Sequence, residues 1–334
     1  MSFIQALIGS ITSAGGGVPL DISTTGGTRN EVGIYSYHTW PSNNTFTLNT
    51  AADRDIEWCL MGGGATAARN GGYSTSPGGG GGAGEQVTGT YSSMPAGTWN
   101  AIIGAGAPTI TGSYPAIPQT WMYGTPGSLS SSSQTSGSGG DNLQANGGGG
   151  GQSVQVGSNW YHGQNGGCGG GGGGVYGNSG NGGAISSYDS SNPAWTSAKG
   201  NVGGGGSYNS SGHAAAGGGG GLGSAGTPAS NRSPWNFYAS PISSGAAGNG
   251  AYHPMTAGSS TIDSTTGCGG AGAGGSTGGE GATAPGGVAA SQAYATPTSA
   301  APANSGSGSS SAQEAGDVGA GGSGYMIIRW VTLV

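Results

Sequence analysis

The side chains best suited to contact another molecule are aromatic residues in the long segments between glycine runs. Aromatic rings stack on sugar faces and on apolar protein patches, and they bring a large contact area at little cost in rotamer entropy. Neighbouring Ser and Asn side chains could add hydrogen bonds. The sequence predicts a binding surface that contains Tyr114, Trp121, Tyr123, Tyr188, Trp195, Trp235, Phe237, Tyr238, Tyr252 and His253. The alternative is that these rings cap the glycine-rich body and form small loop cores.

Catalytic and metal-binding patterns are weak by comparison. Three carboxylates lie in different segments (Asp141, Asp189 and Asp263), and the four histidines are dispersed without a metal-ligand spacing. We therefore expect no enzyme activity, no cofactor and no metal ion. Six Lys and Arg residues, spread along the chain, form no basic patch, so we also expect no nucleic-acid partner.

The three cysteines are far apart and odd in number. Cys59, Cys168 and Cys268 have neither the spacing of a zinc site nor that of a disulfide framework. We interpret them as small buried residues of a protein made in a reducing compartment.

The elements that position the aromatic segments must be built mostly from glycine. Of 334 residues, 82 are glycine, and only 5% are charged, against about 25% in an ordinary globular domain. A glycine has no side chain to bury, yet ordering its backbone costs roughly 1–2 kcal/mol. Either these tracts stay flexible, or backbone hydrogen bonds order them. The low net charge of −6, together with eight Trp and fourteen Tyr, favours order.

Contiguous glycines favour the extended polyproline-II conformation, in which three residues make one turn. Several such helices packed side by side can pair their backbone groups, and only hydrogen fits between them. Each hydrogen bond contributes about 0.5–1.5 kcal/mol, so many runs must cooperate. The sequence predicts such a polyglycine-II lattice from the runs at 62–64, 78–84, 147–151, 169–174, 203–206, 217–221, 269–275 and 316–324.

A small β-sheet base is predicted beside this lattice, with little or no α-helix. Apolar residues alternate with a period of two within 31–104, as expected for half-buried strands. The last residues, 325–334, form the most apolar β-prone run, and we expect them to complete the sheet begun by 46–61. The predicted organisation is an attachment segment (1–30), a β-rich base (31–104, completed by 324–334) and the glycine-rich lattice with displayed loops (105–323).

Connection lengths suggest how the lattice is arranged. Segments 65–77, 152–168 and 207–216 are short, whereas segments 85–146, 175–202 and 222–268 are long. If each run crosses the lattice once, the long connections gather at one end. That end is the predicted binding surface; a further glycine cluster at 278–287 leaves the parity after residue 275 open.

The N-terminal segment contains Phe3, Leu7 and Ile11, whose spacing would put three apolar side chains on one face of a short helix. A helix this short is marginal by itself, so we interpret it as an attachment segment that needs a partner. A frayed terminus is the alternative.

Three stretches resemble the glycine-rich domain of phage tail-fibre and other virion structural proteins. They are Trp58 to Gly64, the tract from Gly78 through Glu85 to Gly106, and Gly321 to Trp330. The alternation of glycine runs with variable loops is similar to the polyglycine-II tip adhesins of T-even-like phages. The resemblance implies host-receptor recognition through loops at the lattice tip, and no cofactor.

These observations together predict a phage fibre or adhesin that is assembled in the host cytoplasm and exposed on the virion surface. Its partners would be other virion proteins, through the N-terminal segment, and a host surface glycan or outer-membrane protein. A homotrimer is one way to satisfy the apolar N terminus. The alternative function is purely structural, as a capsid or tail decoration or a repeating fibre subunit. A secreted silk-like protein is less favoured, because the sequence lacks a signal peptide and true tandem repeats.

Overall fold

The fold is seen in a computed structural model that describes part of the chain in detail. The described residues are 22–24, 26–68, 78–111, 124, 127–136, 143–152, 162–175, 178–179, 181–185, 195–208, 214–229, 245–246, 248, 251–252, 256–257, 260–261, 267–268, 300–301, 303–310 and 317–332.

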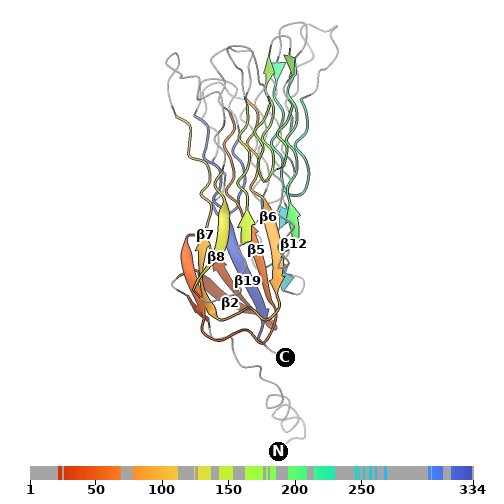
Figure 1. The fold of residues 1–334 in the computed structure, drawn as a ribbon. Coiled ribbons are helices and arrows are strands. Elements are labelled where there is room, and N and C mark those ends of the chain that lie inside the picture. Colours follow the sequence, from red (N-terminus) through yellow and green to blue (C-terminus); the bar gives the residue numbers. More distant parts are fainter. Residues whose placement is uncertain are drawn as a thin grey trace, which may run out of the picture.

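These residues form an all-β structure without a helix, and its two main sheets are antiparallel (Figure 1). The five-stranded sheet has the order β1 (Ile22–Thr24), β4 (Asn44–Leu48), β7 (Gly97–Ile102), β8 (Ser130–Ser136), β9 (Leu143–Ala145). The six-stranded sheet has the order β12 (Trp195–Lys199), β6 (Gln86–Tyr91), β5 (Ile56–Met61), β19 (Tyr325–Val331), β3 (Tyr35–Trp40), β2 (Thr28–Val32).

The C-terminal strand β19 completes a sheet with N-terminal strands, as the sequence predicts, but within the predicted range 46–61 only β5 belongs to that sheet, because β4 lies in the five-stranded one. Strand β19 lies between β3 and β5, so that Ile328 pairs with His38 on one side and with Trp58 on the other. Strands far apart in the sequence therefore form one base. Strands β1 and β2 also belong to the sheets, although they begin within the predicted attachment segment.

The main hydrophobic core lies between the two sheets. It contains four fully buried tryptophans, and the ring of Phe46 lies among three of them, stacked on Trp99 at 5.2 Å between centroids and tilted against Trp40 and Trp58. Side chains of β19 alternate between the two faces of the sheet, and those of Met326, Ile328 and Trp330 lie in this core. Aromatic packing of this kind contributes about 0.5–1.5 kcal/mol per pair beyond the area that it buries.

The opposite face of the six-stranded sheet carries a second buried cluster. It includes Tyr37, Cys59, Tyr325 and Ile327, which have almost no exposed surface. Sheet residues therefore alternate between two buried faces, and β19 is apolar along most of its length for that reason.

The described residues also form four short two-stranded sheets. They are β10 (Gly174–Val175) with β11 (Asn178–Ser179), β13 (Ser207–Tyr208) with β14 (Ala214–Ala215), β15 (Ala251–Tyr252) with β18 (Gly267–Cys268), and β16 (Thr256–Ala257) with β17 (Ser260–Thr261). The first two lie at the end of the molecule away from the sheets (Figure 1).

The predicted arrangement of connections differs from the structure. The long segments 85–146 and 175–202 both return to the sheets, and the short segments 65–77, 152–168 and 207–216 join runs at the end away from the sheets. Residues 85–146 were counted as one long connection at the binding end, although 85–104 also belongs to the predicted β-rich base. They contain β6 and β7 of that base and, in addition, β8 and β9. The chain returns to the sheets twice within this segment. Counting residues between glycine runs misled the prediction, because polar strands such as Ser130–Ser136 lack the apolar alternation that marks a strand in the sequence.

Candidate functional site

Glycine-rich runs continue directly from the strands and extend away from the sheets. Met61 at the end of β5 leads into residues 62–68, and residues 78–85 lead back into β6. Figure 1 shows these runs side by side as long extended segments that lead from the sheets to the opposite end of the molecule, called the far end below. The end that carries the two main sheets is called the sheet end. Runs 62–68 and 78–85 are thus anchored at one end in a packed β-sandwich.

Backbone hydrogen bonds of the runs change direction with a period of three residues. The N–H groups of Gly62, Ala65 and Ala68 all donate to the neighbouring run 78–85, at distances of 3.0 Å. The N–H of Gly63 instead donates to Ser128, and that of Gly64 to Gly322. Successive residues therefore bond to different neighbours, as a helix with three residues per turn requires.

Run 61–68 is completely surrounded by other runs. Hydrogen bonds join it to six neighbours, and these neighbours also bond to one another in a closed ring. In order around the ring, the neighbours are 78–85, 146–152, the run containing Gly124 and 127–129, 103–110, 317–324 and 305–310.

A second run, 168–172, is surrounded in the same way. Its ring consists of 78–85, 146–152, 163–167, 181–185, 200–206 and 216–221. The two rings share runs 78–85 and 146–152, so they form one continuous hexagonal array. Backbone hydrogen bonds hold this array together in three directions.

Close approach of the backbones explains why these runs are glycine. A Cβ added to Gly64 would overlap the carbonyl group of Ser307, and one added to Gly171 would overlap that of Gly217. Both clashes are with backbone atoms, which a change of rotamer cannot move. Where a methyl group does fit, as at Ala65 and Ala83, the side chain is fully buried.

The far ends of the runs are where the intervening segments begin and end. Of the predicted binding residues, Tyr114, Trp121, Tyr123, Tyr188, Trp235, Phe237, Tyr238 and His253 lie outside the described residues, as do the attachment residues Phe3, Leu7 and Ile11. The pairs of run ends at this end of the array are Ala68 and Gly78, Thr111 and Gly124, Gln152 and His162, Tyr208 and Ala214, Ala229 and Gly245, and Ser310 and Asp317.

Two of the predicted binding residues lie in described strands. Trp195 begins β12, where it pairs with Gly89 of β6 at the edge of the six-stranded sheet. Tyr252 ends β15 and pairs with Gly267. The structure therefore places Trp195 at the sheet end rather than beside the segments that leave the far end.

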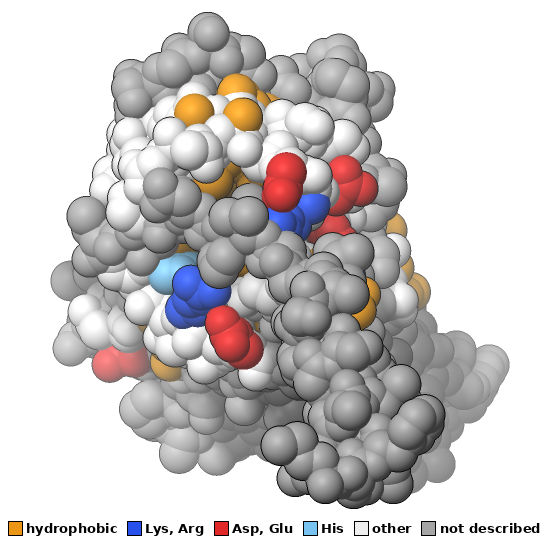
Figure 2. Space-filling model, turned by 90° about the horizontal axis from the view of Figure 1, so that it is seen from below, with side chains coloured by type: hydrophobic (Ala, Val, Ile, Leu, Met, Phe, Trp, Pro, Cys, Tyr) orange, Lys and Arg blue, Asp and Glu red, His pale blue; other side chains and the backbone are white. Residues whose placement is uncertain are grey.

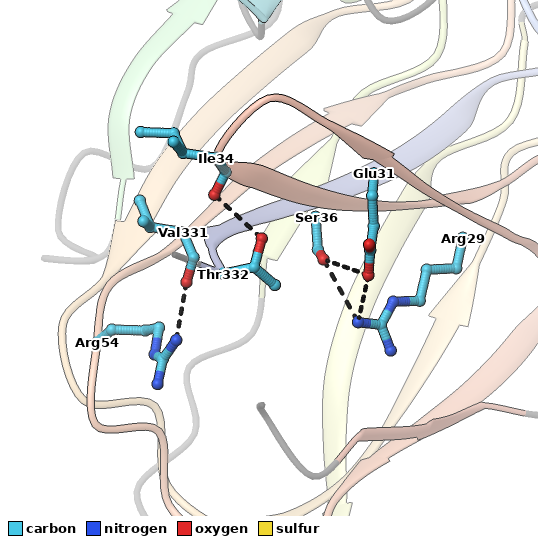
Figure 3. Close-up of polar contacts among 7 residues, drawn as sticks. All are labelled: Arg29, Glu31, Ile34, Ser36, Arg54, Val331 and Thr332. Atoms are coloured by element: carbon cyan, nitrogen blue, oxygen red, sulfur yellow. Dashed lines mark hydrogen bonds and ion pairs between the residues drawn. The ribbon is translucent and has the colours of Figure 1, made fainter. Parts of the chain in front are cut away.

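Among the described residues, charged side chains gather at the sheet end, which the sequence analysis did not single out. Figure 2 shows basic and acidic side chains grouped together on this face, with a histidine beside one group. Arg29 forms an ion pair with Glu31 at 3.2 Å, and Ser36 donates a hydrogen bond to the same carboxylate at 3.4 Å (Figure 3). The guanidinium of Arg29 also lies over the ring of Trp330, at 5.5 Å from its centroid.

Polar contacts tie down the end of the C-terminal strand at the same face. Arg54 donates to the backbone carbonyl of Val331 at 2.9 Å, and the Thr332 hydroxyl donates to the backbone carbonyl of Ile34 at 3.0 Å (Figure 3). The backbone N–H of Thr332 donates to the same carbonyl at 2.8 Å. The Arg54 side chain pairs with Asp53 as well. The sheet end is therefore a fixed polar face.

His38 is the one described histidine in the sheets. Its Nε2 lies 2.9 Å from the carbonyl oxygen of Gly26, and its ring stacks on Trp40 at 4.2 Å. Burial lowers the pKa of His38, and the nearby charge of Arg29 lowers it further. The ring is thus neutral at physiological pH and serves as a packing and hydrogen-bonding group.

Across the second buried face, Arg329 forms an ion pair with Glu57, and its guanidinium lies 4.7 Å from the ring centroid of Tyr35. These partners are far apart in the sequence, so only the pairing of β19 with β5 and β3 brings them together. No local pattern in the sequence predicts this cluster.

The described residues offer no metal-binding group of His, Cys, Asp or Glu side chains. Cys59 and Cys168 are buried, as predicted, and neither forms a disulfide with a described residue. Burial raises the pKa of the Cys168 thiol to about 12. The side chain of Cys268 lies outside the described part of the structure. Within that part, no segment forms a helix suited to crossing a membrane.

Comparison with known proteins adds no assignment. No family model matches the chain, and no curated protein matches it. The functional argument therefore depends on the array and on what its two ends present.

Proposed function

We propose that this chain is a phage virion fibre or adhesin protein that binds a host cell-surface receptor through aromatic side chains at the far end of its glycine runs. The receptor would be a surface glycan or an outer-membrane protein. The N-terminal segment, with Phe3, Leu7 and Ile11, would join other virion proteins. The protein would be assembled in the host cytoplasm and exposed on the particle surface, and a homotrimer would bring three binding ends together.

The array is best explained as a polyglycine-II lattice. The three-residue period of its hydrogen bonds, its six-neighbour packing and the absence of room for Cβ atoms all support this interpretation. Such a lattice is stiff, because opening one run breaks bonds to several others. A stiff support keeps binding segments in place at little entropic cost on binding.

The observation that carries the proposal is the division of the molecule into two different ends. At the sheet end, a sandwich core and a polar network hold the chain in place. At the far end, pairs of run ends bracket segments rich in aromatic residues, such as 230–244 between Ala229 and Gly245. Loops of variable sequence on a rigid scaffold are a common location for binding residues.

A loop replacement tests this proposal without disturbing the lattice. Residues 231–243 are replaced by a short Ser-Gly linker, so that the bond from Thr227 to Ala246 and that from Gly245 to Ala216 are kept. We expect virions that carry the variant in normal amount but adsorb to host cells at least about tenfold less, as the loss of a cluster of binding side chains implies.

Substitutions that retain the rings provide the matched control. The variant with Trp235→Phe, Phe237→Tyr and Tyr238→Phe should adsorb better than the variant in which all three residues are replaced by Ala. Normal adsorption by intact virions that carry the linker would refute the role of this segment.

A repeating structural subunit is the second candidate, and exposed apolar side chains favour it. Ile102 and Leu129 are 45% and 40% exposed near the junction of sheet and lattice. Ile185 and Val202 are 49% and 46% exposed on runs that belong to the other ring. Contacts between neighbouring copies would cover such residues. Copy number on the particle separates the candidates: a few copies at fibre tips support binding, and hundreds support decoration.

A further inference from the structure

Strand β2 (Thr28–Val32) forms one edge of the six-stranded sheet, at the sheet end of the molecule (Figure 1). It pairs with β3 on one side, and among the described residues no strand pairs with its other side. Residues 28–31 are all exposed, so this edge is open to solvent along most of its length. An open edge offers its backbone N–H and C=O groups to a strand of another chain.

The hydrogen bonds of β3 show which way its backbone groups point. The backbone N–H of Thr332 donates to the carbonyl of Ile34 at 2.8 Å, so the backbone of Ile34 faces the side on which β19 lies. Successive residues of an antiparallel strand direct their backbone groups to opposite sides. The backbone groups of Tyr35 and Tyr37 therefore face β2.

The same alternation identifies the residues of β2 that face outward. The partners of these two tyrosines on β2 are Val32 and Asn30, whose backbone groups are thus used within the sheet. Arg29 and Glu31 alternate with them along the strand. The N–H and C=O groups of Arg29 and Glu31 therefore point to the open edge.

The side chains of these two outward-facing residues carry opposite charges and are held in place. Arg29 pairs with Glu31 at 3.2 Å, and the hydroxyl oxygen of the buried Ser36 lies 3.4 Å from both charged groups (Figure 3). The guanidinium of Arg29 also lies over the ring of Trp330. The two charged side chains remain 42% and 65% exposed, so a second molecule can reach both of them.

This charge pattern favours one register of pairing between two β2 strands. In an antiparallel pair with a two-fold axis at Asn30, Arg29 of each copy lies opposite Glu31 of the other copy. A slip of two residues puts two Arg29 or two Glu31 side chains opposite each other, which is unfavourable. A slip of one residue opposes outward-facing backbone groups with inward-facing ones.

We propose that two copies of this chain associate by antiparallel pairing of their β2 strands about Asn30. Arg29 of each copy and Glu31 of the other would exchange backbone hydrogen bonds and form an ion pair across the contact. Charged side chains commonly protect an edge strand from pairing; here their opposite signs restrict pairing to a single register. The contact joins copies two at a time, so it differs from a homotrimer, and it does not depend on what the far end binds.

Charge reversal tests the proposal by sedimentation equilibrium of the full chain. The unmodified chain should form dimers whose dissociation constant rises with salt concentration. Arg29→Glu leaves only acidic charges on the edge and Glu31→Arg leaves only basic ones, so each variant alone should dimerise at least about tenfold more weakly.

Two controls separate loss of the contact from loss of folding. An equimolar mixture of the two variants should dimerise again, because opposite charges then face each other, and the double exchange of Arg29→Glu with Glu31→Arg should dimerise like the unmodified chain. An unmodified chain that is monomeric or trimeric would overturn the proposal. Single variants that dimerise normally, or a mixture that stays monomeric, would do the same.

A disulfide trap tests the register itself. The Cα atoms of Asn30 in the two copies would lie about 4.5 Å apart, which a disulfide can bridge. Asn30→Cys should therefore give a covalent dimer on a non-reducing gel after mild oxidation. Thr28→Cys is the matched control, because it lies opposite Val32 of the other copy and about 14 Å along the strand from its own counterpart. Equal linkage of the two variants, or no linkage of Asn30→Cys, would contradict the proposed pairing.

Discussion

Gly64→Ala is the sharpest test of the hexagonal array. Gly64 lies in the encircled run 61–68, where its N–H donates to Gly322 at 2.8 Å and its carbonyl accepts from Ala107 at 2.9 Å. A methyl group at Gly64 would overlap the backbone carbonyl of Ser307. The clash can be relieved only by moving one run against another.

The expected cost follows from the two kinds of interaction that such a shift disturbs. Overpacking of a tight interior costs about 1–3 kcal/mol, and weakening two backbone hydrogen bonds adds about 0.5–1.5 kcal/mol each. We expect Gly64→Ala to lower the free energy of unfolding by about 2–6 kcal/mol, measured by urea unfolding followed by tryptophan fluorescence.

Gly33→Ala is the matched control, since a Cβ at Gly33 meets no atom within 4 Å. Its positive φ of 63° leaves only a backbone cost of about 1 kcal/mol. Adding Ser307→Gly to Gly64→Ala should restore no stability, because the clash is with the backbone of Ser307. Equal effects of Gly64→Ala and Gly33→Ala, or rescue by Ser307→Gly, would refute the reasoning from close-packed backbones.

Three other predictions concern buried polar and charged groups. Burial raises the pKa of Glu85, against the opposing effect of its hydrogen bonds, so the folded state holds this proton more tightly than the unfolded state. The free energy of unfolding should therefore fall as the pH rises from the ordinary carboxyl pKa of 4.5 through the raised pKa of Glu85. Glu85→Gln should reduce this fall, as measured by urea unfolding at a series of pH values between 4.5 and 8. Cys59 and Cys168 should resist a thiol reagent in the folded protein and react after denaturation; rapid labelling of the native state would contradict their burial. Arg54→Ala should cost about 1.5–3 kcal/mol because it removes a charged hydrogen bond to the end of β19, whereas Arg29→Ala, which breaks a more exposed ion pair, should cost less than about 1 kcal/mol in the same unfolding assay.

The sequence predicted the β part of the fold well where apolar residues alternate. The pairing of β19 with the N-terminal strands followed from its apolar character, since such a strand needs neighbours on both edges. Strands β8 and β12 could not be predicted in the same way, because Ser-rich or mixed sequences give no period-two signal.

The order of neighbours in the array was beyond prediction for a different reason. One glycine run has no side chains that distinguish it from another, so the sequence does not specify that 61–68 lies against 305–310 rather than 216–221. The structure shows where this information comes from: strands such as β5, β6 and β19 are paired in fixed register, and the runs that continue from them inherit that order. For the candidate binding residues, the sequence located the aromatic segments, but it could not place Trp195 at the sheet end.

This dependence of the array on the sheets leads to a physical account of how a glycine-rich chain reaches a single structure. Runs alone could pair in many registers of nearly equal energy, since every residue offers the same donor and acceptor. The sandwich core removes this degeneracy. Trp58, Trp99 and Trp330 pack in the core and hold their strands in place, so they fix the axial position of the runs that are continuous with those strands. Ala65 and Ser309 then select among the remaining arrangements, since each must occupy a position with room for a Cβ. Variation in the intervening segments changes neither the sandwich core nor these buried Cβ positions, so the array can accept intervening segments of new sequence without redesign of its core.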